Sequence, residues 1–220
     1  MITTLIALAM TPTAQAADIT NVTRDSTLQV DEYVDQTSSI TSDATSTDVT
    51  LVELPLDVQL DQYDGGALIK DGTAQLRQKL DVDAQELSMT VRQESDHTFV
   101  ALGEVMQTTL DNEMLLTFDV TADTDVEIWG DYDGVVNLVP GVDREYVHFE
   151  IRESGAATAL WSTHGLPNGV GVFSDVVSLQ AGTTYEVTAR GDMRTNGEQG
   201  TAYAFFRTHL NAHVSIVPSP

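Results

Sequence analysis

Apolar and polar side chains alternate along most of the chain, and this two-residue period is the feature that most constrains the fold. In one example, Leu116, Phe118 and Val120 alternate with polar residues. Successive side chains of a strand point to opposite faces of its sheet, so the pattern predicts strands with one apolar and one polar face. It recurs in residues 56–61, 87–92, 116–121, 126–128, 147–152, 185–190 and 210–216.

Turn-forming pairs separate these segments and indicate tight connections. They are Gly65-Gly66, Asp71-Gly72, Asp133-Gly134, Asn168-Gly169, Ala181-Gly182 and Asn196-Gly197. Sheets with one apolar face must pair over a common core. We therefore predict an all-β fold, an antiparallel β-sandwich that is jelly-roll-like. Only residues 72–80 and 103–112 tolerate a helical interpretation, and both windows are short.

The first sixteen residues predict an export signal. They carry no charged side chain, include an apolar stretch from Leu5 to Met10, and end in Ala14-Gln15-Ala16. This pattern is typical of a secretory signal peptide (residues 1–16) cleaved before Ala17, although no Lys or Arg precedes the apolar stretch. The alternatives are an ordinary N-terminal strand or a misassigned start. No other stretch approaches the ~20 apolar residues of a spanning helix, so no membrane anchor is expected.

The rest of the chain divides by composition. Residues 17–50 are rich in Thr, Ser and Asp, and predict short strands at 27–34 and 49–54 joined by an exposed loop. Residues 51–217 carry the strict alternation and predict the β-sandwich domain, while 218–220 form a Pro-rich end.

The charge balance excludes several classes of partner. The chain has 34 acidic and 10 basic residues, a formal net charge of −24. A phosphate backbone or an anionic membrane is bound by clustered Lys and Arg, and no basic run is present, so no nucleic-acid partner is expected. The acidic excess suits a saline exterior, where salt screens the self-repulsion. Cysteine is absent, which excludes disulfides, thiolate metal sites and cysteine nucleophiles.

Two further stretches carry a family resemblance. Residues 179–185 (LQAGTTY) lead into an alternating strand, and the last strand ends in Val217 followed by Pro218, Ser219 and Pro220. With the export signal and the acidic sandwich, this resembles exported bacterial proteins of the PEP-CTERM type. The resemblance implies that residues 218–220 are a Pro-x-Pro sorting motif, with Ser219 in the place of Glu, and that an exosortase-like processing enzyme is a partner.

That resemblance indicates where the protein is located and does not indicate an enzymatic activity. The family's apolar span and Arg cluster do not follow Pro220 in this sequence, so either the sequence is part of a longer chain or the protein is not sorted in this way. The alternative is a β-protein that ends in a Pro-rich tail. The family includes surface, biofilm and extracellular-matrix proteins, so an extracellular or cell-surface location is expected.

No catalytic motif is present, and we expect no enzymatic activity. The sequence lacks a G-x-S-x-G elbow, a phosphate-binding P-loop and a dinucleotide fingerprint. His209 and His213 have the spacing of a helical zinc motif, but on a strand four residues span about 13 Å, too far for one ion. They are expected to be surface or edge histidines.

A calcium site is the one candidate cofactor site. Asp123, Asp125, Asp131 and Asp133 cluster in the acidic stretch 123–134. Calcium takes six to eight oxygen ligands, which loop Asp residues commonly supply. The spacing does not fit an EF-hand loop, and a solvated acidic hairpin loop is the alternative.

Three aromatic side chains are candidates for contact with carbohydrate. Trp129, Tyr132 and Trp161 can offer flat apolar faces to a sugar ring. Trp129 falls on the polar parity of its strand, whereas Trp161 follows Leu160 near a turn and is equally compatible with a cap on the core.

Together these features predict an exported, non-catalytic cell-surface or extracellular-matrix protein with a structural or adhesive role. The alternatives are a carbohydrate-binding module and, further, a secreted hydrolase, which needs two carboxylates facing each other in a cleft. The expected partners are extracellular polysaccharide or other surface proteins.

Overall fold

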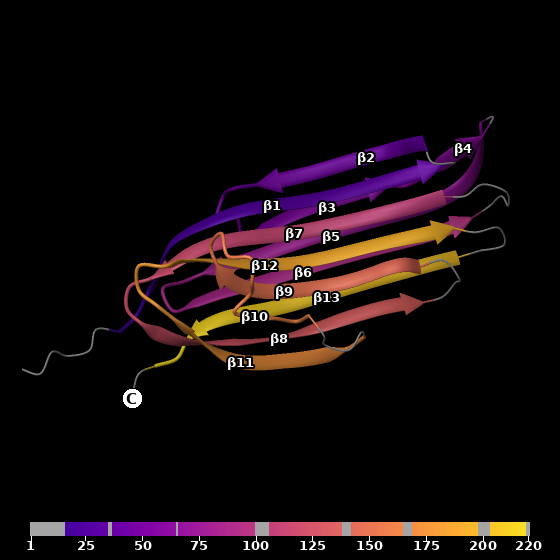
Figure 1. The fold of residues 1–220 in the computed structure, drawn as a ribbon. Coiled ribbons are helices and arrows are strands. Elements are labelled where there is room, and N and C mark those ends of the chain that lie inside the picture. Colours follow the sequence, from indigo (N-terminus) through magenta and orange to yellow (C-terminus); the bar gives the residue numbers. More distant parts are fainter. Residues whose placement is uncertain are drawn as a thin grey trace, which may run out of the picture.

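The computed structural model describes residues 16–34, 37–64, 66–99, 106–137, 142–164, 169–197 and 203–218. Two antiparallel sheets lie face to face (Figure 1), and the described residues contain no helix. The predicted all-β, jelly-roll-like sandwich is confirmed. Within the described part of the chain there is no helix with the length and apolar character needed to cross a membrane.

The two layers of the sandwich are called sheet A and sheet B, and each is made of the strands given below. Sheet A contains, in spatial order, β10 (Trp161–Ser162), β9 (Val142–Glu153), β12 (Thr184–Gly197), β7 (Met106–Val120), β1 (Ile19–Val34) and β2 (Thr37–Ser46). Sheet B contains β11 (Gly171–Leu179), β8 (Thr124–Asn137), β13 (Tyr203–Ile216), β6 (Glu86–Phe99), β5 (Ala67–Val82) and β3 (Glu53–Gln59), with β4 (Gln62–Asp64) paired to β5. From β7 onward the chain passes repeatedly between the two sheets, as in a jelly roll.

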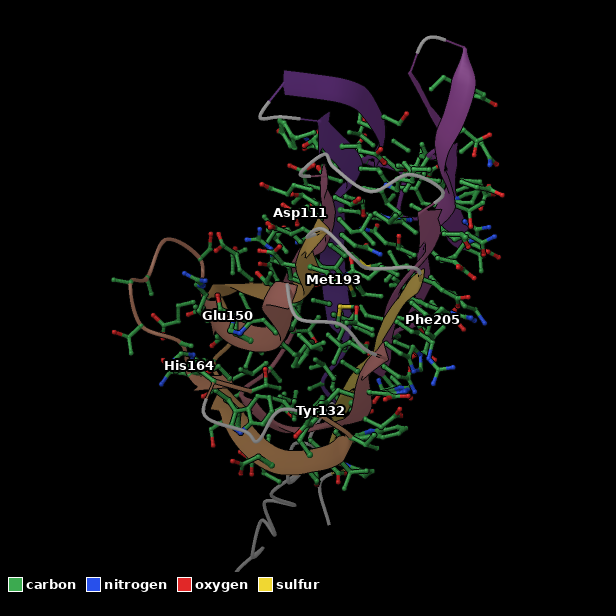
Figure 2. The ribbon with its side chains drawn as sticks, turned by 90° about the vertical axis from the view of Figure 1, so that its right-hand side faces the viewer. Asp111, Tyr132, Glu150, His164, Met193 and Phe205 are labelled. Carbon is green, nitrogen blue, oxygen red and sulfur yellow. The ribbon has the colours of Figure 1, made fainter. Side chains whose placement is uncertain are left out.

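The alternation of the sequence sets the inside and the outside of the sandwich. Leu116 and Phe118 of β7 face inward with Val187 of β12, opposite Ile128 and Val214 of sheet B, and all five are buried. A second apolar cluster lies farther along the sheets and includes Leu28, Val30, Leu76, Leu110 and Met193. Figure 2 shows Met193 between the two layers, with Glu150 and His164 toward one outer side and Phe205 toward the other.

The N-terminal strands differ from the prediction. β1 lies inside sheet A, paired with both β7 and β2, so residues 19–34 and 37–46 belong to the sandwich and do not stand before it. The stretch 37–46, expected in an exposed loop, is strand β2. Its Thr and Ser residues are polar on both faces, which an edge strand tolerates because it has one hydrogen-bonded neighbour and Thr favours strands.

Other sequence predictions fall on strands or outside the described residues. The window 72–80 lies within β5, and residues 106–112 of the second helical window lie within β7. Residues 1–15 of the predicted signal peptide and residues 219–220 of the predicted sorting motif lie outside the described part of the chain.

Close packing around β8 requires glycine at Gly130. A Cβ built there meets the backbone oxygen of Asn211 at 2.1 Å and Cζ of Phe173 at 2.6 Å. Gly130 is paired with Phe173 across β8 and β11, so the aromatic ring occupies the space that a side chain would need. This contact fixes β11 beside β8, the strand that carries Trp129.

Candidate functional site

The outward face of sheet B carries a stacked pair of rings. Trp129 of β8 is directly opposite His213 of β13, and their ring centroids are 3.7 Å apart with an interplanar angle of 2°. The indole Nε1 donates a hydrogen bond to Ser215 Oγ at 3.3 Å. Trp129 is nevertheless 38% exposed. The indole is therefore held in a fixed orientation while part of its surface faces solvent.

The free face of the indole is directed toward the edge of the sheet. His213 covers the side toward β13, and the cross-strand neighbour on the other side, in β11, is the small Ser174. Val172 and Val176, which flank Ser174 on the same outward face, are 81% and 56% exposed. Trp129, Val172 and Val176 form an exposed apolar strip, called here the indole strip.

Hydrogen-bonding groups lie beside the indole strip. Asn211 Nδ2 donates to Asp131 Oδ1 at 3.3 Å, one cross-strand row from Trp129. His213 Nδ1 lies 2.5 Å from Glu86 Oε1. An apolar ring face bordered by carboxylates and amides is the chemistry that a sugar requires, because each sugar combines apolar C–H faces with hydroxyl groups.

A depression of about 250 Å³ lies farther along the same face. It is lined by Arg92, Asp133, Arg207 and His209. Arg207 Nη2 lies 2.8 Å from Asp133 Oδ2. Because Asp133 follows Trp129 by four residues on β8, the depression is about 13 Å from the indole along the strand.

A second depression, of about 510 Å³, lies on the outward face of sheet A. Its ionisable lining residues include Glu113, His148, Glu150, Arg152, His164 and Arg190. His148 Nε2 lies 3.0 Å from Glu150 Oε2, and Arg152 also contacts this carboxylate. Arg190 lies 3.4 Å from Glu113. Both arginines of this depression are therefore paired with carboxylates, as Arg207 is in the first depression.

The second depression predicts an acid-sensitive contribution to stability. Burial lowers the pKa of His148 below its usual 6.5, and the nearby His164, Arg152 and Arg190 lower it further. Because the folded-state pKa is below the unfolded one, this contribution is fully present above pH 6.5 and is lost as the pH falls through the folded-state pKa.

We therefore expect the His148→Gln variant to lose less stability than the unaltered protein on acidification. Urea unfolding between about pH 7.5 and about pH 5.5 measures the difference. Identical slopes of stability against pH would show that His148 is not buried as a neutral imidazole.

The structure separates the three aromatic candidates for sugar contact. Trp129 is outward and exposed, as its parity predicts. Tyr132 is buried in the core on the opposite face of β8. Trp161 packs on Phe149 and Phe173, with ring centroids 6.2 and 5.2 Å apart, as part of the inner layer. The three rings do not form one platform.

The four aspartates predicted as calcium ligands are not brought together. Asp123 and Asp125 lie at the start of β8, while Asp131 and Asp133 lie farther along this extended strand. Asp123 accepts a hydrogen bond from the Ala181 backbone at 2.8 Å. Among the described residues no group of three or more His, Cys, Asp or Glu side chains can hold a metal ion. A strand spreads its residues apart, whereas a loop would have gathered them.

Sequence reasoning did not identify several residues of this face. His209 and His213 were expected at the surface without a role, yet His213 stacks on Trp129 and His209 lines the depression. Arg92 and Arg207 were not singled out. Parity along each strand indicates that these side chains face outward, but their proximity depends on strand pairing, which the sequence does not encode locally.

Comparison with known proteins leaves the family open. No family model matches the chain, and no curated protein matches it. A carbohydrate-binding module (CBM6cm-2) from Cellvibrio mixtus lichenase 5A, solved in complex with cellotriose, is similar with 10% identity and a TM-score of 0.25, over 66% of this chain and 88% of that one.

A second solved structure is similar to a comparable degree. The C-terminal CBM6 of LamC, a marine laminarinase from Zobellia galactanivorans, has 10% identity and a TM-score of 0.24, over 74% of this chain and 99% of that one. At these TM-scores the likeness carries no weight for what this chain binds.

Proposed function

We propose that the protein binds a polysaccharide on the outward face of sheet B and performs no chemistry on it. The observation that carries this proposal is the half-open indole of Trp129, fixed on one side by the His213 ring and open on the other toward Ser174. A ring that is already ordered loses little conformational entropy when a sugar stacks on it.

The proposed setting is the cell exterior, on the basis of the uncharged apolar segment at residues 1–16. Polysaccharide binding is compatible with the structural or adhesive surface role that the sequence predicts. That role, the sorting motif at 218–220 and an exosortase-like partner stay predictions.

The test is calorimetric titration with a panel of oligosaccharides, preceded by a glycan array to choose them. We expect Trp129→Ala to weaken binding at least tenfold, or about 1.4 kcal/mol, because the stacking surface is removed. Tyr63→Ala is the matched control, since Tyr63 is an exposed aromatic (62%) on β4, away from the indole strip.

Two results would contradict the proposal. One is a panel in which no oligosaccharide binds the unaltered protein. The other is binding that Trp129→Ala leaves unchanged. Release of new reducing ends during incubation would favour the hydrolase alternative instead.

A further inference from the structure

Basic side chains are scarce in this chain, yet several gather on one part of sheet B. In the strand register, Arg77 of β5 is directly opposite Arg92 of β6, and Arg92 is directly opposite His209 of β13. Arg207 lies two residues from His209 on the same outward face. Arg77, Arg92 and Arg207, together with the ionisable His209, are called here the cationic row. The chain has only 10 Lys and Arg residues against 34 Asp and Glu residues.

Two guanidinium groups, those of Arg77 and Arg92, are directly opposite each other in this row. Like charges directly opposite each other on a sheet destabilise it by a few tenths of a kcal/mol or more. Each arginine of the row is paired with a carboxylate: Arg92 lies 2.8 Å from Glu94, Arg207 lies 2.8 Å from Asp133, and Arg77 lies 2.6 Å from Asp57. In Arg92 and Arg207 the contact is made by Nη2, one of the three nitrogens of the guanidinium group. Both arginines that line the depression still expose much of the side chain, 52% for Arg92 and 40% for Arg207.

We propose that the ligand is an anionic polysaccharide, whose carboxylate or sulfate ester groups are bound by Arg92 and Arg207 while one sugar ring stacks on Trp129. This inference rests on the proposed polysaccharide binding and specifies its chemical class. A guanidinium group donates two parallel hydrogen bonds to a carboxylate or a sulfate, which gives geometric specificity as well as attraction.

The spacing of the binding groups on the outward face of sheet B favours an extended ligand. The depression is about 13 Å from the indole along the strand, a span that a short oligosaccharide bridges. Farther along β13, the partly exposed ring of Phe205 has the same outward parity as His209 and His213. The ring of Trp129 on β8, Arg207 on β13 and the ring of Phe205 on β13 thus follow one another along two neighbouring strands.

The charge pattern also favours a polysaccharide over a nucleic acid. Glu127 and Asp131 stand on either side of Trp129 on β8, and both face outward. They suit the hydroxyls of an uncharged sugar unit but repel a backbone that carries a charge on every residue. The ligand is therefore a chain with charged and uncharged units. The net charge of −24 acts at longer range and is screened within about 8 Å at physiological salt.

The test compares four probes by calorimetry at physiological ionic strength. They are a hyaluronan hexasaccharide, which alternates carboxylate and neutral units, a κ-carrageenan hexasaccharide, which alternates sulfated and unsulfated units, neutral cellohexaose, and single-stranded oligothymidylate. The variants are Arg92→Gln/Arg207→Gln and, as the matched control on sheet A, Arg152→Gln.

We expect at least one anionic hexasaccharide to bind about tenfold tighter than cellohexaose. The double Arg variant should lose this preference, and Arg152→Gln should keep it. Whether the hyaluronan or the carrageenan probe binds tighter distinguishes carboxylate from sulfate. Thermal unfolding of the double variant checks that it folds.

Four results would overturn the inference. Trp129-dependent binding of cellohexaose with no gain for either anionic probe would remove the anionic ligand and leave the proposed function standing. A preference for anionic probes that survives in the double Arg variant would remove the role of the cationic row. Tighter binding of oligothymidylate would overturn the inference and the proposed function together. Binding of no probe would overturn the inference, while the oligosaccharide panel decides the proposed function.

Discussion

Replacing Lys70 with methionine should lower the free energy of unfolding by about 3–5 kcal/mol. Lys70 Nζ lies 2.7 Å from Glu32 Oε2, and their side chains are only 1% and 0% exposed. Methionine keeps the length of the side chain but removes the ammonium group. The Glu32 carboxylate then stays in the interior without this counter-charge, and burying a charge in that way is among the costliest single changes in a protein.

A double-mutant cycle separates the charge from the packing. In Lys70→Met combined with Glu32→Gln neither residue carries a charge, so we expect this variant to recover most of the stability lost in Lys70→Met. Urea unfolding of the four proteins measures the coupling. Stability of Lys70→Met equal to that of the unaltered protein would show that the two groups are not paired in the interior.

Replacing Asn112 with alanine should cost about 3–4 kcal/mol. Asn112 projects inward from β7 of sheet A, and its Nδ2 donates to the backbone oxygens of Arg77 at 3.1 Å and Arg92 at 2.9 Å, both in sheet B. Its Oδ1 accepts a hydrogen bond from Gln78 Nε2 at 2.9 Å. The substitution removes three hydrogen bonds of a fully buried side chain, each worth about 1 kcal/mol net, and leaves a small cavity.

The matched control is Asn211→Ala, the same change on the outward face of β13. We expect it to cost less than about 1 kcal/mol, because solvent can replace its hydrogen bonds. Guanidinium unfolding of both variants makes the comparison. Equal losses in the two variants would contradict the view that Asn112 ties the two sheets together.

The prediction for Asn112 also concerns the candidate site. Its two backbone acceptors belong to Arg77 and Arg92, which are residues of the cationic row. The inward amide therefore holds the β5 and β6 backbones at the level where their side chains face the proposed ligand. The hydrogen bonds from Asn112 in sheet A to sheet B therefore contribute both to the stability of the fold and to the position of the candidate site.

The two-layer architecture could be predicted because the alternation is local. Leu116 and Phe118 face inward and Trp129 faces outward, as their parity indicates. The strand at 37–46 was missed because Thr, Ser and Asp dominate its sequence, with Ile40 and Ala44 as its only apolar residues. Lys70 shares the inward parity of Ala74 and Leu76, but its counter-ion lies 38 residues away in β1, and sequence spacing does not reveal that contact.

The site depends on pairing across long distances in the chain. Trp129 and His213 meet because β8 and β13 are neighbours in sheet B, and Arg77, Arg92 and His209 align because of the register of three strands. A shift of one residue in any pair would turn these side chains to the other face. The four aspartates predicted as calcium ligands lie apart for the opposite reason, since neighbours in the sequence are spread out along one extended strand.

Fluorescence titration of the Trp161→Phe variant tests the central claim most directly. The chain has two tryptophans, so this variant leaves Trp129 as the sole indole reporter. A bound oligosaccharide should shift the Trp129 emission to shorter wavelength and protect it from acrylamide quenching, because the sugar replaces water on the open ring face. An unchanged spectrum and unchanged quenching, with an oligosaccharide that calorimetry shows to be bound, would place the ligand elsewhere and contradict the account.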